Sequence, residues 1–225
     1  DVCSSDLPSI CVIGGAGHVG LPLSLAFTTV GKSVLIYDIN QKTSEKIRKG
    51  VLPFFEEGAE TLLKNALSKD LLHLTNDPLK IAGIENIIIT IGTPIDEFHN
   101  PTLKLIRECI DELTPVLSAD QLLILRSTVS PGVTNWLSKY LKEKKINCDI
   151  AFCPERVVQG HGIEEIKSLP QIVSGTTKKA EDKAAELFKM VAPTIVRLTC
   201  METELAKLFS NAFRYIQFAA TNQFY

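Results

Sequence analysis

Short apolar runs alternate along the chain with longer stretches of helical periodicity. Five near-continuous apolar runs predict strands that are covered on both faces, at residues 9–14, 33–37, 85–91, 121–125 and 148–152. Helical patterns lie between or beside these runs, at residues 21–30, 41–49, 57–68, 103–117 and 133–144. This alternation predicts an α/β fold in which crossover helices join the strands of a doubly wound parallel sheet.

The pattern continues more weakly toward the C-terminus. Further strands are predicted at residues 71–74, 171–174 and 195–198, with a helix at 178–190. A last, long helix begins at Thr199, whose side chain can cap it while Glu202 reaches back as the other half of a capping box. We therefore expect a first domain over residues 8–198 and the start of a central helical domain over residues 199–225.

Composition narrows the class of protein. The chain has 225 residues, 45% of them hydrophobic, and its 24 basic and 26 acidic side chains leave a net charge of −2. That hydrophobic content excludes a disordered chain, and the absence of a basic block argues against a nucleic-acid partner. The length corresponds to about one and a half domains, which indicates a fragment of a longer protein.

Two further features bear on location and on the natural start of the chain. The six cysteines are scattered without metal-ligand spacing, so we expect no metal site and a reducing, cytoplasmic compartment. Residues 9–31 carry no Asp, Glu, Lys or Arg, but several glycines and Pro22 interrupt them, so neither a membrane span nor a signal peptide is expected. Residues 1–7 (DVCSSDL) correspond to codons resembling a sequencing-adaptor tail, and we expect the natural chain to begin near Pro8.

A glycine-rich motif joins the first predicted strand to the first helix. In GAGHVG, Gly15 is expected to allow a tight turn, Gly17 to let backbone amides approach a pyrophosphate, and Gly20 to let the helix pack on the strand. Asp38 ends the second strand, where its carboxylate can accept both ribose hydroxyls and repel a 2′-phosphate. The sequence therefore predicts a Rossmann-like domain that binds NAD rather than NADP, the alternative being an ordinary glycine-rich turn with a surface aspartate.

Three later loops also follow predicted strands, where open parallel sheets bind ligands. The loop at 92–94 contains Thr93 and the loop at 127–132 (STVSPG) contains Thr128, although both could be simple turns. In the loop at 153–162 (CPERVVQGHG), Glu155 could act as a base and Arg156 could clamp a phosphate or carboxylate, or the two could form a surface ion pair. His161 has no orienting partner that the sequence identifies and is interpreted as a solvated residue.

The long helix places three polar side chains on one face. Lys207, Asn211 and Arg214 follow the spacing i, i+4, i+7, so an ammonium, an amide and a guanidinium form a row suited to an oxygen-rich ligand. A solvated helix face is the alternative.

Together these motifs resemble the nucleotide-sugar 6-dehydrogenase family. The resemblance covers residues 9–225 and rests on six motifs in family order: GAGHVG, YDIN, GTP, STVSPG, CPERV and ETELAKLFSNAFR. It implies oxidation of a sugar C6 alcohol to the uronic acid through an aldehyde and a thioester, with two NAD consumed. It further implies a cofactor site lined by His18, Val19, Asp38, Thr93 and Thr128.

The resemblance also implies roles in the reaction itself. Glu155 would activate water against the thioester, with Thr128 helping to position the reacting oxygen, and Lys207 with Asn211 would stabilise the oxyanion. The nucleotide sugar would contact Arg156, Val157 and Arg214. Homodimerisation through the long helix is implied as well, and this helix carries many apolar residues for one facing water.

Departures from the family pattern sharpen the hypothesis. Arg156 and Gln159 stand where the UDP-glucose branch has Phe and Glu, and PERV resembles the N-acetylhexosamine branch, UDP-N-acetylmannosamine dehydrogenases in particular. UDP-N-acetylglucosamine and UDP-glucose remain alternative substrates. The family's nucleophilic cysteine belongs to a glycine-rich loop beyond the long helix, and none of the six cysteines replaces it, so we expect this chain to bind NAD without completing turnover. The sequence also leaves open a hydroxyacid-type dehydrogenase and an NAD-binding sensor domain.

Overall fold

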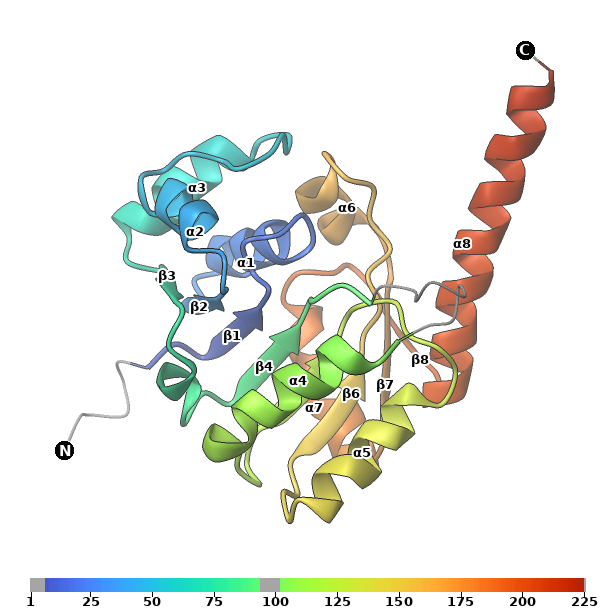
Figure 1. Ribbon diagram of the computed structural model, residues 1–225. Helices are drawn as coiled ribbons and strands as arrows, with labels where there is room; N and C mark the ends of the chain where they lie inside the picture. Colours follow the sequence, from blue (N-terminus) through green and yellow to red (C-terminus); the bar gives the residue numbers. More distant parts are fainter. Residues whose placement is uncertain (1–6, 94–101, 225) are drawn as a thin grey trace.

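An eight-stranded sheet with helices on both faces forms the body of the computed structural model, which describes residues 7–93 and 102–224 (Figure 1). The strand order is β3-β2-β1-β4-β5-β6-β7-β8, so the order reverses between β1 and β4. Open α/β sheets bind ligands outside the carboxyl ends of the strands at such a reversal. The strands are β1 (Ile10–Ile13), β2 (Val34–Tyr37), β3 (Leu72–Thr75), β4 (Asn86–Ile89), β5 (Leu122–Leu125), β6 (Asp149–Phe152), β7 (Gln171–Gly175) and β8 (Ile195–Arg197).

The helices follow the predicted periodicity, with two short 3₁₀ turns added. The predicted helix at 103–117 is interrupted at Thr114, because Pro115 lacks the N–H that a continuing α-helix needs. The sequence analysis missed α6, which has only two turns. The helices and 3₁₀ turns are α1 (Gly20–Thr29), α2 (Gln41–Arg48), α3 (Ala59–Ser68), η1 (Pro78–Ile81), α4 (Lys104–Leu113), η2 (Thr114–Val116), α5 (Val133–Glu143), α6 (Gly162–Ser168), α7 (Lys178–Lys189) and α8 (Cys200–Gln223).

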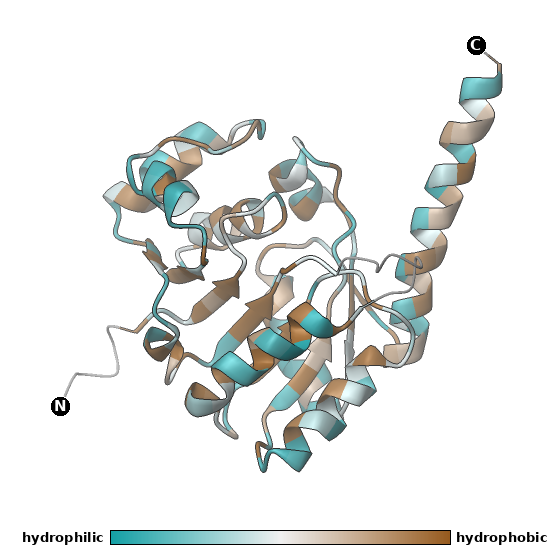
Figure 2. Cartoon of the chain, in the orientation of Figure 1, coloured by the Kyte–Doolittle hydropathy of each residue, from teal (hydrophilic) through white to brown (hydrophobic). Residues whose placement is uncertain are grey.

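Each face of the sheet has its own apolar core. Ile10 and Val12 of β1 pack toward the side covered by α1, α3, α6 and α7, whereas Cys11 and Ile13 pack toward α4 and α5. Side chains alternate between the two faces of a strand, so a strand buried on both sides must be apolar throughout. Figure 2 accordingly shows mostly apolar colouring along the central strands. The predicted doubly wound α/β class is confirmed.

The expectation of a wholly parallel sheet needs one correction. β1 to β6 are parallel, but β7 pairs with β6 in the antiparallel sense and β8 runs parallel to β7. The connection from β6 to β7 contains only the loop at 153–161 and α6, which packs against α1 near the same edge of the sheet. A parallel strand would need a crossover helix that returns the chain to the edge where β6 starts, and α6 does not do this. The chain therefore enters β7 at the edge where β6 ends, and β7 runs antiparallel to β6.

The long helix α8 begins as predicted and then leaves the body of the domain. Thr199 caps it and Glu202 completes the capping box, with the Thr199 backbone N–H donating to the Glu202 carboxylate at 2.8 Å. Its first turn is buried at Cys200, Thr203 and Glu204, while residues 209–224 are all exposed (Figure 1). Within residues 7–93 and 102–224, no helix is both long and apolar enough to cross a bilayer. The predicted adaptor segment lies outside the described residues except for Leu7, as do Pro94 and Tyr225.

Candidate functional site

The glycine loop after β1 is shaped by close contacts at two positions and left open at a third. A Cβ on Gly20 would lie 2.5 Å from the Gly15 Cα, and a Cβ on Gly15 would lie 2.8 Å from the Val12 carbonyl oxygen. At Gly17 the nearest atom would be the Gly14 carbonyl oxygen, at 3.4 Å. Close packing therefore requires glycine at positions 15 and 20, while the outer side of Gly17 has room for a ligand to approach the backbone.

The tight turn itself falls one residue earlier than the sequence indicated. Gly14 has a φ of +72°, in the left-handed region that favours glycine, whereas Gly15 has no such backbone. The close packing predicted for Gly20 is confirmed, and Gly14 rather than Gly15 supplies the turn, while the approach of a pyrophosphate to Gly17 stays a prediction.

Asp38 closes the other side of this loop. Its Oδ2 accepts a hydrogen bond from the Ala16 backbone N–H at 3.0 Å, and its Oδ1 accepts one from the Asn40 N–H at 2.9 Å. A cavity of about 470 Å³ lies beside the carboxylate, with a lining that includes Gly14, Gly17, Tyr37, Ile91 and Cys109. An apolar cavity next to a glycine loop and a fixed carboxylate fits the adenosine part of NAD.

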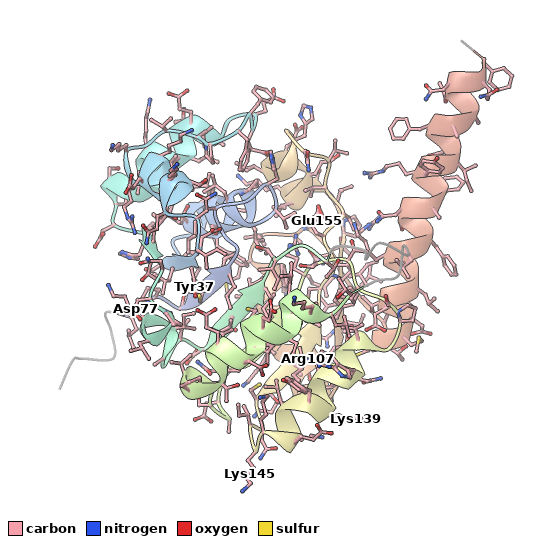
Figure 3. The ribbon with its side chains drawn as sticks, viewed as in Figure 1. Tyr37, Asp77, Arg107, Lys139, Lys145 and Glu155 are labelled. Carbon is pink, nitrogen blue, oxygen red and sulfur yellow. The ribbon has the colours of Figure 1, made fainter. Side chains whose placement is uncertain are left out.

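The remaining residues predicted for the cofactor lie around the same edge. His18 is exposed and its ring lies against that of Phe54, with centroids 4.0 Å apart, and Val19 is the half-buried N-cap residue of α1. The hydroxyl of Tyr37, a residue labelled in Figure 3, donates to Glu112 Oε1 at 2.7 Å, and both residues line the cavity. Burial and proximity to the carboxylate both raise the pKa of Tyr37, so this hydroxyl stays protonated.

The loops after β4 and β5 are joined by hydrogen bonds between their hydroxyls and carbonyls. The Thr93 hydroxyl donates to the Thr128 carbonyl oxygen, and the Ser127 hydroxyl donates to the Ile91 carbonyl oxygen. Thr128 itself is half-buried. The two loops that the sequence left open as possible turns thus form one linked surface beside the glycine loop.

Glu155 is held by backbone groups of its own loop. It is 9% exposed, its Oε1 accepts from the Val157 N–H, and its own N–H donates to the Arg126 carbonyl oxygen at 3.2 Å. Arg156 turns away and donates to the Pro170 carbonyl oxygen at 3.3 Å. Within the described parts of the chain neither side chain has an ion-pair partner, so the alternative of a Glu155–Arg156 surface pair is wrong.

Lys207 on α8 lies within range of the negative charge of Glu155, although the two side chains form no ion pair among the described residues. Burial lowers the pKa of the half-buried Lys207 ammonium, and the negative charge of Glu155 opposes that shift. Figure 3 labels Glu155 in the space between the sheet and α8. Asn211 and Arg214 continue along α8 but are exposed. The carboxylate of Glu155 and the ammonium of Lys207 thus act on each other through their charges without forming an ion pair, an arrangement that leaves both able to bind an oxygen-rich group.

A buried arginine that the sequence pattern did not reveal acts on both Glu155 and Lys207 through its charge. Arg126 is 1% exposed, donates to Gln171 Oε1 at 3.0 Å and to the Cys153 carbonyl oxygen at 3.3 Å, and its guanidinium lies 5.1 Å from the Phe188 ring centroid. Burial lowers its pKa, and the charge of Glu155 opposes this. The sequence offered one indication of this buried charge. Arg126 directly follows the fully apolar strand LLIL, where a charged side chain is not expected unless it has a partner.

A second missed residue joins the loop at 153–162 to the N-terminal half. Glu56 is 5% exposed, and its carboxylate accepts from the Gly160 N–H at 3.2 Å and the Ile163 N–H at 3.0 Å. Its neighbour Glu57 pairs with His161 Nδ1 at 2.9 Å on the exposed surface. His161 is therefore exposed, as interpreted, but it has a partner that spacing in the sequence did not reveal.

Five of the six cysteines are described, and all five are free thiols. Burial raises the pKa of Cys153 to about 12, of Cys109 to about 12 and of Cys148 to about 11. Burial also raises the pKa of Cys11 and Cys200. A thiol nucleophile must ionise, so none of these five is set up to attack a substrate at neutral pH.

Comparison with known proteins identifies the family. Residues 8–192 match the model for the UDP-glucose/GDP-mannose dehydrogenase family, NAD binding domain. The chain is 30% identical over 216 residues to UDP-N-acetyl-D-mannosamine dehydrogenase of Pyrococcus horikoshii, covering 93% of this chain and 51% of that protein. It is 31% identical to UDP-glucose 6-dehydrogenase of Rickettsia prowazekii, covering 93% of this chain and 49% of that protein.

The fold comparison agrees. The solved structure of the Pyrococcus horikoshii UDP-D-ManNAc dehydrogenase superposes with a TM-score of 0.89 at 29% identity, over 96% of this chain and 52% of that one. The chain thus spans about half the length of the curated relatives it matches. It belongs to the UDP-glucose/GDP-mannose dehydrogenase family, and the matched region is that family's NAD-binding domain.

Proposed function

We propose that this chain is the NAD-binding and part of the substrate-binding portion of a nucleotide-sugar 6-dehydrogenase. The observation that carries the proposal is the set of hydrogen bonds linking the loops after β4 and β5, together with buried Glu155 and half-buried Lys207, whose charges act on each other. An ordinary glycine-rich nucleotide domain would not need this pair. The overall reaction converts the C6 alcohol to an aldehyde, then to a thioester on a cysteine, and finally, with water, to the uronic acid.

The cofactor would be held by the glycine loop and the cavity beside Asp38. Gly17 leaves room for the pyrophosphate, the Asp38 carboxylate can accept the ribose hydroxyls, and the cavity of about 470 Å³ can take the adenine. His18, Val19, Thr93 and Thr128 would line the remainder. When bound, NAD supplies the hydride acceptor for both oxidations.

The chain's own residues would perform the acid–base and electrostatic work. Glu155 would take a proton from the water that attacks the thioester, and Thr128 would orient the reacting oxygen. Lys207, whose pKa burial lowers, would place its ammonium against the oxyanion, with Asn211 as a second donor. The thiol would come from a part of the protein outside these 225 residues.

The substrate proposed first is a UDP-N-acetylhexosamine, with UDP-N-acetylmannosamine ahead of the others. Arg156 and Val157 lie on the loop that carries Glu155, and Arg214 lies on the Lys207 face of α8, so all three could contact the nucleotide sugar. Arg156 in place of Phe is the feature that separates this chain from the UDP-glucose branch of the resemblance. The chain's relatives include both UDP-N-acetyl-D-mannosamine and UDP-glucose dehydrogenases.

The long helix supports two further parts of the proposal. α8 exposes Phe209, Phe213, Ile216 and Phe218 at 62–67%, an apolar surface that dimerisation would cover. We therefore propose that residues 199–225 begin the central helical domain and pair with a second copy of the chain. The five free thiols support a cytoplasmic setting.

Binding measurements on the 225-residue chain test the function. Isothermal titration with NAD should show binding. Once NAD is present, UDP-N-acetylmannosamine should bind more tightly than UDP-N-acetylglucosamine or UDP-glucose. Arg156→Phe should reduce that preference, with Lys167→Phe, on nearby α6, as the control. NAD binding without affinity for any UDP-sugar would instead favour the sensor domain, and sustained NADH production would contradict the assignment of the thiol to another part of the protein.

A further inference from the structure

Glu204 is a buried carboxylate that the proposed reaction does not use. It lies in the first turns of α8 and is only 1% exposed. A carboxylate is rarely removed from water without strong hydrogen-bond donors around it, since burial disfavours the charge. Its position must therefore be explained by the groups that it binds.

Its partners are donors at the start of another helix, which have no hydrogen-bond acceptor within their own helix. Glu204 Oε2 accepts from the Gly132 N–H at 2.6 Å, and Oε1 accepts from the Thr134 N–H at 2.8 Å and the Thr134 hydroxyl at 2.6 Å. Gly132 is the N-cap residue of the eleven-residue helix α5 and has no side chain with which to cap it. Glu204 thus caps α5 from a distant part of the chain, and its charge lies at the positive end of the α5 dipole.

This contact joins two of the three segments that carry the proposed reacting groups, the loop after β5 and α8. Gly132 closes the STVSPG loop that contains Thr128, and Lys207 lies three residues after Glu204, on the same face of α8. From residue 209 onward every described residue of α8 is exposed, so the helix is held to the domain mainly through its first turns. The direction in which Lys207 points depends on how those turns are seated.

We propose that Glu204 is a positioning residue, which seats α8 on the N-terminus of α5 and thereby sets Lys207 against Glu155 and the Thr128 loop. The catalytic meaning of this seating depends on the proposed function. The seating itself depends only on the three hydrogen bonds.

Lys207 reports on the seating because its charged neighbours come from several elements. Glu155 and Arg156 face it from the loop after β6, Arg126 from the end of β5, and Arg214 from α8. If α8 loses its anchor, Lys207 becomes more hydrated and more distant from the two arginines of the domain body. Hydration and distance from the arginines raise the pKa of its ammonium, whereas distance from Glu155 lowers it. Because burial is the largest cause of the present shift, the net change is upward, toward the ordinary lysine value of about 10.4.

The test is Glu204→Gln in the 225-residue chain, with Glu202→Gln as the matched control. Glu202 lies on the same helix, and a glutamine there keeps the capping box. In Glu204→Gln we expect hydrogen exchange at the Gly132 and Thr134 amides to rise at least about tenfold, as the seating opens. We also expect the pH midpoint of Lys207 amine labelling, followed by mass spectrometry, to move upward. Glu202→Gln should change neither.

Two outcomes would overturn the proposal. In the first, hydrogen exchange at Gly132 and Thr134 becomes faster but the pH midpoint of Lys207 labelling does not change. This result would mean that Glu204 only stabilises α5. Unchanged exchange would mean that the contact does not seat α8 at all. If Glu204→Gln does not fold, Thr134→Val removes one donor, and a smaller upward shift of the Lys207 midpoint is expected, with no shift contradicting the proposal.

The same variants separate this inference from the proposed function. UDP-sugar affinity should fall about tenfold in Glu204→Gln, whereas NAD affinity should fall by less than about threefold, because most of its proposed contacts lie in the glycine loop and beside Asp38 rather than in the Thr128 loop. If the unmodified chain binds no UDP-sugar but the Lys207 midpoint still shifts, the proposed function fails and the seating role stands. If UDP-sugar binds and the midpoint does not shift, the reverse holds.

Discussion

Two regions of this domain are built on different length scales. The glycine-loop region (residues 10–38) is closed by a hydrogen bond from Ala16 to Asp38, 22 residues apart. The α8 region (residues 126–134, 153–162 and 200–207) depends on Glu204 reaching Gly132 and Thr134, 72 and 70 residues away. The first is a local motif that a short stretch of chain can specify. The second exists only when the whole domain has folded, so the two should respond differently to substitution.

The largest effect is expected within the glycine loop. Gly20→Ala would place a Cβ 2.5 Å from the Gly15 Cα, where backbone meets backbone and neither can move aside. We expect a loss of about 3 kcal/mol in the free energy of unfolding, measured by urea denaturation. Gly17→Ala, with its nearest contact at 3.4 Å, should lose less than about 1 kcal/mol yet bind NAD at least about tenfold more weakly. Equal stability losses in the two variants would contradict this view of the loop.

The next effect concerns a buried carboxylate that reaches the α8 region from afar. Glu56→Ala would leave the Gly160 and Ile163 amides without their acceptor, and we expect a destabilisation of about 2 kcal/mol by urea denaturation. Glu57→Ala is the control, since its exposed pair with His161 should contribute less than about 0.5 kcal/mol. If the two neighbours proved equally sensitive, the long-range contact would not support this loop.

A change of about tenfold in cofactor choice is expected at Asp38. Asp38→Asn keeps an oxygen that can accept from the Ala16 amide but removes the negative charge, so the loop should persist while repulsion of a 2′-phosphate is lost. The ratio of NADP to NAD affinity, measured by titration calorimetry, should rise about tenfold, or about 1.4 kcal/mol. Asp77→Asn, at the cap of η1, should leave the ratio unchanged. An unaltered ratio in Asp38→Asn would show that its charge does not select the cofactor.

The smallest effect is a pH dependence of the free energy of unfolding, which arises from Asp149 at the start of β6. Burial alone would raise the pKa of Asp149, but hydrogen bonds from Lys183 and Lys179 outweigh it and hold this pKa below its ordinary value. Because the folded pKa is depressed, the stabilisation is complete above about pH 3.9 and disappears as the pH falls through the folded value. Asp149→Asn should therefore lose about 1 kcal/mol at pH 7 in urea denaturation and nothing in strong acid.

The control for that pH profile is Asp120→Asn. Asp120 is exposed, and only its backbone carbonyl accepts from Lys183, so its side chain should not affect the acid limb of the curve. A difference between Asp149→Asn and the unmodified chain that persists unchanged in strong acid would assign the effect to packing rather than charge.

Most of the α/β architecture follows from the sequence because buried parallel strands must be apolar on both faces. Over the parts of the chain that the structure describes, the pattern located every strand and all but one of the α-helices, and the capping box at Thr199 located the start of α8. α6 was missed because a two-turn helix carries too little periodicity to recognise. The reversed direction of β7 was also missed, since a strand's composition does not reveal the direction in which it enters the sheet.

By itself, then, the sequence determined the sheet, the glycine loop, the carboxylate at Asp38 and the motifs that place the chain in its family. These depend on local geometry: a Cβ that cannot fit, a cap three residues away, a strand covered on both faces. The tertiary structure alone decided that the charge of Glu155 would act on Lys207 while Arg156 donates to a backbone carbonyl, and that Arg126, Glu56 and Glu204 would be buried charges with backbone partners. Which donors surround a buried charge depends on contacts between segments far apart in the chain, and no spacing within a single segment specifies them.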